Sequence, residues 1–153
     1  MDKMKPFYLL FCGFMLYYRK KAEGKDMVFI GVSRAFSLKN EEQYDTIGAF
    51  WEEMSAVYGM ENLQGLGYGW KDGVILYAIG LKQGEIPHAN AIITLPDSGW
   101  ECVRGRTDDL QQIYREIYQD GPLEWEIEKF DENGDCVIRY YRKNSKGRGQ
   151  VCV

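Results

Sequence analysis

The chain has 153 residues, with 19 basic and 23 acidic side chains and a formal net charge of −4. This length fits one domain with a core of its own, and the acidic balance without a basic helical stripe argues against direct nucleic-acid binding. The four cysteines form no CxxC pair and there is a single histidine. Neither a zinc site, a disulfide framework nor a histidine triad is therefore predicted, and we expect no metal and no cofactor.

An apolar run of 12 residues, Phe7–Tyr18, lies between basic flanks near the N-terminus. It is too short to span a bilayer, which takes about 20 residues, and no A-x-A-like cleavage site follows it. We expect it to be buried against the domain or in a homodimer, in a cytoplasmic protein; a signal peptide or anchor is the alternative. We divide the chain into an extension (1–26), one domain (27–143) and a basic tail (144–153).

The first half of the domain reads as strand, helix and hairpin. Met27–Phe36 has the β-branched and aromatic composition of a strand. Asn40, with Gln43 three residues later, predicts the N-cap of a helix, and apolar residues at helical spacing continue to a stop at Gly59. Trp51 lies on this apolar stripe, where plain core packing is its simplest interpretation.

A hairpin is predicted over Gly65–Leu81, with its turn at Asp72-Gly73. Counting outward from that turn places three aromatic side chains on one face, opposite glycines that would let a helix approach the other. This aromatic face is a candidate binding surface. Its residues are Tyr68, Trp70 and Tyr77.

The second half repeats the order. Strands are predicted at Ala91–Leu95 and Trp100–Gly105, followed by a helix capped at Thr107 and ended by Gly121-Pro122. The last hairpin, Trp125–Arg142, turns at Asn133-Gly134, the strongest short hairpin signal in the chain.

Counting outward from Asn133-Gly134 pairs Glu128 with Arg139 and Glu126 with Tyr141. One face would then be core, and the other would carry carboxylates beside aromatic side chains. We predict that this second face has a function. It holds Glu126, Glu128, Phe130, Val137, Arg139 and Tyr141.

The two halves share the order strand, helix, hairpin, which predicts an α+β domain made of duplicated βαββ repeats. Their hairpins would form one joined antiparallel sheet, with both helices on one side and a ligand groove on the other.

The local sequences GVSRAFS, IGAFWEEM, LYAIGL, QQIYREIY and IEKFDENGD resemble the GyrI-like effector-binding family, related to the ligand-binding domains of AraC- and MerR-type multidrug regulators. The resemblance implies an aromatic groove that binds lipophilic, often cationic, small molecules around a buried glutamate, carried here by Glu128. The last strand, VIRYYRK, departs from the family, because Arg139 opposite Glu128 would oppose a cation. No helix-turn-helix remains after the elements are assigned, which indicates a stand-alone binding domain.

These patterns predict small-molecule binding, with no catalytic residue assigned. A simpler possibility is that Glu128 and Arg139 form only an exposed ion pair. The same groove could instead belong to a hydrolase of reactive small molecules, or the domain could be a protein-interaction module of the gyrase-inhibitor type. The candidate ligand-binding residues are Glu128, Tyr68, Trp70, Tyr77, Phe130, Arg139, Tyr141, Glu126 and Trp51.

Overall fold

The computed structural model describes residues 26–143. Except for Asp26, the predicted N-terminal extension lies outside the described residues, as does the tail 144–153. The predictions made for Phe7–Tyr18, including the homodimer, lie there too.

The described chain forms a strand, a helix and a hairpin, then two strands, a second helix and a second hairpin, with three short 3-10 helices between them. The predicted elements are all present. The strands are β1 (Asp26–Ser37), β2 (Leu63–Lys71), β3 (Val74–Leu81), β4 (Ala91–Pro96), β5 (Glu101–Arg106), β6 (Leu123–Phe130) and β7 (Asp135–Arg142). The helices are η2 (Lys39–Glu41), α2 (Gln43–Tyr58), η3 (Met60–Asn62), η4 (Thr107–Asp109) and α3 (Leu110–Gln119).

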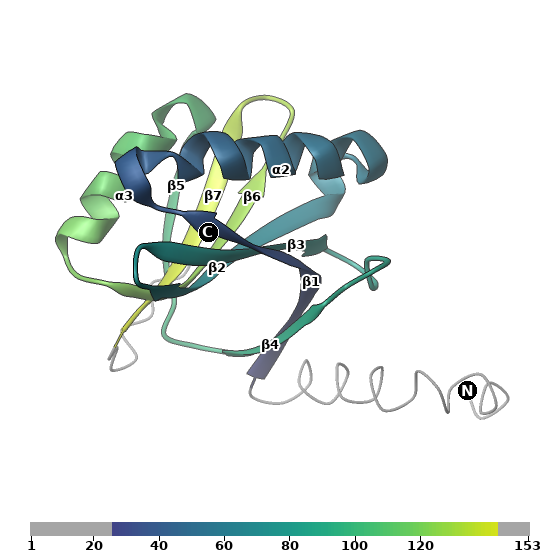
Figure 1. The fold of residues 1–153 in the computed structure, drawn as a ribbon, viewed down its shortest axis with the longest axis horizontal. Coiled ribbons are helices and arrows are strands. Elements are labelled where there is room, and N and C mark those ends of the chain that lie inside the picture. Colours follow the sequence, from purple (N-terminus) through teal and green to yellow (C-terminus); the bar gives the residue numbers. More distant parts are fainter. Residues whose placement is uncertain (1–25, 144–153) are drawn as a thin grey trace, which may run out of the picture.

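The seven strands form one antiparallel sheet in the order β4-β1-β3-β2-β6-β7-β5. Both helices cover the same face of this sheet (Figure 1). The β2–β6 pair joins the two halves of the sheet. From β2 the sheet continues outward through β3 and β1 to β4, and from β6 it continues through β7 to β5. The predicted α+β class, joined sheet and common side for the helices are confirmed.

The helix starts differ from the prediction. Asn40 does not cap α2: it has a left-handed backbone (φ 55°) inside η2, and α2 begins only at Gln43, without a side-chain cap. Thr107 likewise opens η4 rather than α3. Asparagine tolerates the left-handed region, so here it turns the chain between strand and helix instead of capping. Gly59 does end α2, with φ 83°.

The register of the β6–β7 hairpin is shifted by one residue from the predicted one. Asp131 accepts hydrogen bonds on Oδ1 from the backbone N–H groups of Asn133 and Asp135, at 2.9 Å each, and Gly134 takes the left-handed conformation (φ 82°). The loop therefore has three residues, and Glu128 pairs with Ile138.

A shift of one residue moves a side chain to the other face of a sheet. Arg139 pairs with Ile127 and Tyr141 with Trp125, so both lie on the face opposite Glu126 and Glu128. The predicted Glu128–Arg139 pair is therefore wrong.

The β2–β3 hairpin turns where predicted, since Asp72 and Gly73 have φ values of 53° and 75° and Lys71 pairs with Val74. A bulge between Tyr68 and Lys71 then shifts the register. Tyr68 consequently pairs with Leu76, and Tyr77 lies on the opposite face. The predicted aromatic face does not form.

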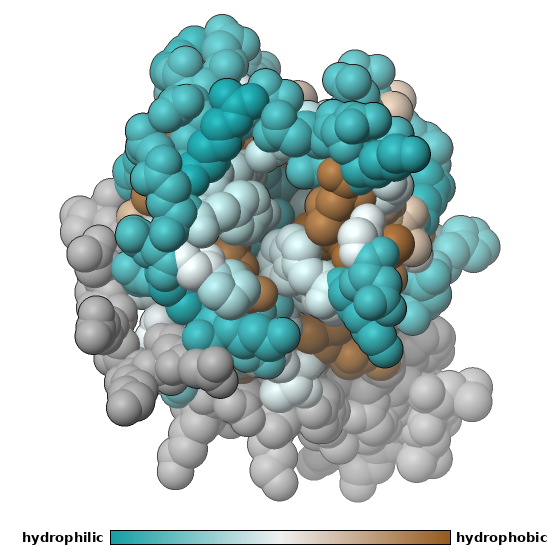
Figure 2. Space-filling view, turned by 60° about the vertical axis from the view of Figure 1, so that its left-hand side comes forward, coloured by the Kyte–Doolittle hydropathy of each residue, from teal (hydrophilic) through white to brown (hydrophobic). Residues whose placement is uncertain are grey.

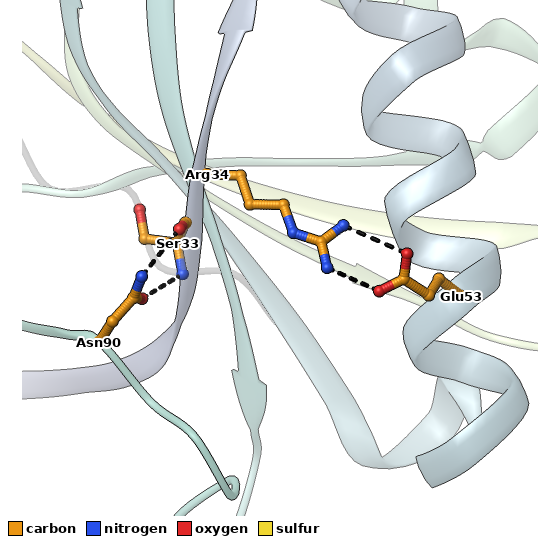
Figure 3. A network of polar contacts seen from close by, with 4 residues as sticks. All are labelled: Ser33, Arg34, Glu53 and Asn90. Atoms are coloured by element: carbon orange, nitrogen blue, oxygen red, sulfur yellow. Dashed lines mark hydrogen bonds and ion pairs between the residues drawn. The ribbon is translucent and has the colours of Figure 1, made fainter.

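Two polar contacts join β1 to neighbouring parts of the fold (Figure 3). The Arg34 guanidinium binds both carboxylate oxygens of Glu53 on α2, at 2.6 and 3.3 Å, and lies 4.2 Å from the centre of the Phe50 ring. The Asn90 side chain binds the backbone N–H and C=O of Ser33. These contacts tie α2 and the loop before β4 to β1.

Candidate functional site: a cavity between the two helices

A cavity of about 790 Å³ lies on the helix-covered face of the sheet, lined by both helices and by the strands beneath them. It exists because α2 packs over β1 and β3, whereas α3 packs over β5. Figure 2 shows the molecule hollowed between two polar walls, with apolar surface inside the hollow. The sequence predicted a ligand groove on the face of the sheet without helices. This cavity lies on the other face, so the prediction is wrong for it.

One face of α2 forms a wall of the cavity. The lining residues recur every three or four positions, which places them along a single helical stripe. On α2 they are Gln43, Tyr44, Ile47, Gly48, Trp51, Glu52, Ser55 and Ala56. Gly48 faces open space here, since a Cβ added to it would meet no atom within 4 Å.

The floor of the cavity carries two carboxylates from β6, Glu126 and Glu128, each only 4% exposed. As alternate residues of a strand they point to the same face. Both are buried side by side in the protein interior, where charged side chains are rarely found without a partner of opposite charge.

Glu128 is held by two phenols. The Tyr77 hydroxyl donates to Oε1, and the Tyr114 hydroxyl donates to Oε2 at 2.7 Å. Trp51 Nε1 donates to the Tyr77 oxygen at 2.8 Å. Burial raises the pKa of Glu128, and the two phenol hydrogen bonds partly oppose that rise.

Glu126 has a weaker set of donors. The Tyr118 hydroxyl donates to its Oε2 at 3.1 Å. Burial, followed by the charge of Glu128, raises the pKa of Glu126 well above its ordinary value, and the Tyr118 hydrogen bond opposes this. Burial likewise raises the pKa of Tyr77, Tyr114 and Tyr118, so these phenols stay neutral donors.

Among residues 26–143, no lysine, arginine or histidine lines the cavity. The remaining charged lining residues are all acidic, namely Glu52, Asp108, Asp131 and Glu132. The ion pairs within the described part of the chain join other side chains and leave Glu126 and Glu128 without a cationic partner. The cavity therefore combines acidic groups with aromatic walls and, within the described residues, has no basic lining side chain.

Two glycines of β2 make room for these carboxylates. Gly65 pairs with Glu128 and Gly67 with Glu126 across the β2–β6 ladder. A Cβ on Gly67 would come within 2.7 Å of the Glu126 side chain. Gly67, together with Gly69, was expected to admit a helix; Gly67 makes room for the Glu126 side chain instead, and Gly65 makes room for Tyr77.

The structure brings five of the nine predicted site residues to the cavity. They are Trp51, Tyr77, Glu126, Glu128 and Phe130. The other four, Tyr68, Trp70, Arg139 and Tyr141, do not line it. Trp70 packs against the hydrophobic core that the helices cover.

The remaining three face away from the helices. The hydroxyls of Tyr68 and Ser33 are 2.6 Å apart, and Tyr141 packs edge-on to Trp125 and Trp100. Arg139 lies 5.5 Å from the centre of the Trp100 ring. Tyr68 and Tyr141 pack against a smaller hydrophobic cluster on that face, which includes Trp100.

Sequence reasoning missed the phenols that the helices contribute. Tyr114 and Tyr118 lie in the predicted second helix and Tyr44 in the first, and none of them was named as a site residue, yet all three line the cavity. A signal was present, because a tyrosine on the inner face of a helix carries a hydroxyl group that needs a hydrogen-bond partner. In the structure the partners of Tyr114 and Tyr118 are the carboxylates of Glu128 and Glu126.

Residues 26–143 contain no group of three or more His, Cys, Asp or Glu side chains that could hold a metal ion. None of the helices in that range is long and apolar enough to cross a membrane.

Comparisons of sequence find no match, neither among protein-family models nor among curated proteins. Comparison of the fold finds similar solved structures. SAV2435, solved bound to tetraphenylphosphonium, superposes with a TM-score of 0.58 at 14% identity over 79% of this chain and 92% of its own. A candidate transcription regulation protein from Staphylococcus aureus MU50 gives 0.55 at 15% identity over 75% and 91%. The chain therefore shares the fold of these two proteins.

Proposed function

We propose that this protein binds lipophilic aromatic cations as a small-molecule binding protein of the effector-binding type found in transcription regulators. One observation carries the proposal. Glu126 and Glu128 are buried at the floor of an aromatic cavity, and their hydrogen-bond partners in the described chain are neutral phenols.

The physical argument is that a buried carboxylate lacks compensation until a positive charge arrives. Removing such a charge from water costs several kcal/mol, which phenol hydrogen bonds repay only in part. A lipophilic cation supplies the missing charge and loses little hydration on entering. The faces of Trp51, Tyr44 and Phe130, which line the cavity, would add about 0.5–2 kcal/mol each through cation–π contacts.

The fold comparison supports this proposal, because SAV2435 was solved with a lipophilic aromatic cation. The strand order supports the finer idea of a duplicated βαββ unit, in which each half supplies one helix as a wall of the cavity. The duplication itself stays a prediction.

Calorimetric titration with three probes of similar size tests the charge preference: tetraphenylphosphonium, tetraphenylborate and triphenylphosphine oxide. The cation should bind more tightly than the neutral compound, and the anion should bind most weakly. Glu128→Gln should weaken the cation at least about tenfold, a loss of about 1.4 kcal/mol, with a smaller effect on the neutral probe.

Glu61→Gln is the matched control, since Glu61 is exposed and lies outside the cavity lining. It should leave all three affinities unchanged. Equal affinities for the three probes on the wild-type protein would contradict the proposal.

A hydrolase that uses the same cavity is the second candidate. The raised pKa of Glu126, beside the Tyr118 hydroxyl, is the observation that favours it, because a carboxyl protonated near neutral pH can act as a general acid. Chemical turnover of a bound compound, followed by mass spectrometry, separates this candidate from reversible binding.

A further inference from the structure

The cavity floor has two acids where one would suffice for a monocation. Glu126 and Glu128 are alternate residues of β6, so their Cα atoms are about 6.8 Å apart and their side chains point the same way. The spacing gives the floor two separate places for negative charge.

The two acids differ in how they are held. Both oxygens of Glu128 accept a phenol hydrogen bond, from Tyr77 and Tyr114. Glu126 accepts one on Oε2, from Tyr118, and within residues 26–143 no such phenol donates to its Oε1. Hydrogen bonds to the charged form keep a carboxylate ionised, so Glu128 is the better-stabilised anion of the pair.

The groups that face Glu126 contain no positive charge. They come from every element packed around it: Glu128 beside it on β6, Tyr77 on β3, Tyr44 on α2, Tyr114 and Tyr118 on α3, and Tyr140 opposite it on β7. The nearest residue on β2 is Gly67. Arg115 is engaged with Glu41 at 3.2 Å on the exposed surface.

Two like charges buried this close cannot both stay ionised without compensation. We propose that Glu126 holds a proton in the empty cavity and gives it up to the solvent when a dication binds. The cavity then selects aromatic dications whose two positive centres are about as far apart as alternate residues of a strand. This rests on the proposed function. A 4,4′-bipyridinium has two nitrogens at such a separation, one for each carboxylate.

The matched probes are N,N′-dibenzyl-4,4′-bipyridinium, a dication, and 1-benzyl-4-phenylpyridinium, a monocation of similar rings. Calorimetry near neutral pH in phosphate and in Tris reports proton release, because the two buffers differ in ionisation enthalpy. The dication should bind at least about tenfold more tightly than the monocation and release a proton.

Glu126→Gln should abolish the proton release and remove the preference for the dication, with little effect on the monocation. Glu61→Gln is again the matched control, because Glu61 is exposed and lies outside the cavity lining. It should keep both the proton release and the preference.

The outcomes separate the two proposals. Equal binding of both cations without proton release overturns this inference and leaves the proposed function intact. Failure of both cations to bind overturns the proposed function as well. If Glu126→Gln does not fold, as judged by circular dichroism, the buffer comparison on the wild-type protein still decides, since it needs no variant.

Discussion

Gly65 lies against the hydroxyl group of Tyr77, and a Cβ at Gly65 would come within 2.0 Å of the hydroxyl oxygen. The same hydroxyl donates to Glu128, the residue that pairs with Gly65 across the β2–β6 ladder. The Gly65 backbone needs no left-handed conformation, so glycine is required here by space alone. Gly65 therefore leaves space for the Tyr77 hydroxyl group that donates to Glu128 at the floor of the cavity.

Gly65→Ala should therefore displace the Tyr77 ring from Glu128. Overpacking of this kind costs about 1–3 kcal/mol of unfolding free energy, and cation affinity should fall with it. Urea denaturation and titration with tetraphenylphosphonium measure the two effects. Gly48→Ala is the control for the glycine-to-alanine change, because a Cβ at Gly48 meets no neighbour.

Gly48 lies inside α2 with an ordinary helical backbone and no close contact, so nothing in the packing requires a glycine. Gly48→Ala should stabilise the protein by up to about 1 kcal/mol, the helix-propensity difference. Gly48→Leu should instead fill cavity space. It should weaken tetraphenylphosphonium while a smaller cation such as N-methylpyridinium keeps its affinity. An equal loss for both cations would show that Gly48 does not set ligand size.

The buried acids predict an unusual pH dependence of stability. Their pKa values are raised in the folded protein, so near neutral pH the folded state binds more protons than the unfolded chain. The free energy of unfolding then falls as pH rises from about 4.5 through the folded-state pKa values. Without ligand, Tm should be lower at about pH 8 than at about pH 5.

Glu126→Gln removes the group with the larger cost of ionisation. The variant should melt higher than the wild-type protein at about pH 8, and the difference should disappear at about pH 5, where Glu126 is protonated in the fold. Calorimetric melting at both values checks this. A variant that is less stable at the higher pH would mean that the Glu126 carboxylate stabilises the fold.

Arg139 provides a test of the register. From the sequence, its neutralisation was expected to tighten cation binding by freeing Glu128. Because Arg139 lies on the opposite face of the sheet, Arg139→Leu should leave tetraphenylphosphonium affinity within about twofold in ordinary salt, where the distant charge is largely screened. A large gain in affinity would instead favour the register in which Arg139 faces Glu128.

The sequence by itself determined the elements and indicated one buried acidic residue. Helical periodicity located α2 and α3, Gly59 ended the first helix, and Asp72-Gly73 marked a true two-residue turn. These signals are local, because they depend on backbone preferences within a few residues. The resemblance of the strand around Glu128 indicated a buried acid, and Glu128 is buried.

Only the tertiary structure decided which side chains meet. The bulge between Tyr68 and Lys71 and the three-residue loop capped by Asp131 each shift a register by one. These shifts place Tyr68 and Tyr77, and likewise Arg139 and Glu128, on opposite faces of the sheet. The donors to the acids come from another element, since Tyr114 on α3 reaches Glu128 across 14 positions of sequence. The cavity exists because two helices cover separate halves of the sheet, and that spacing results from packing, which no local pattern contains.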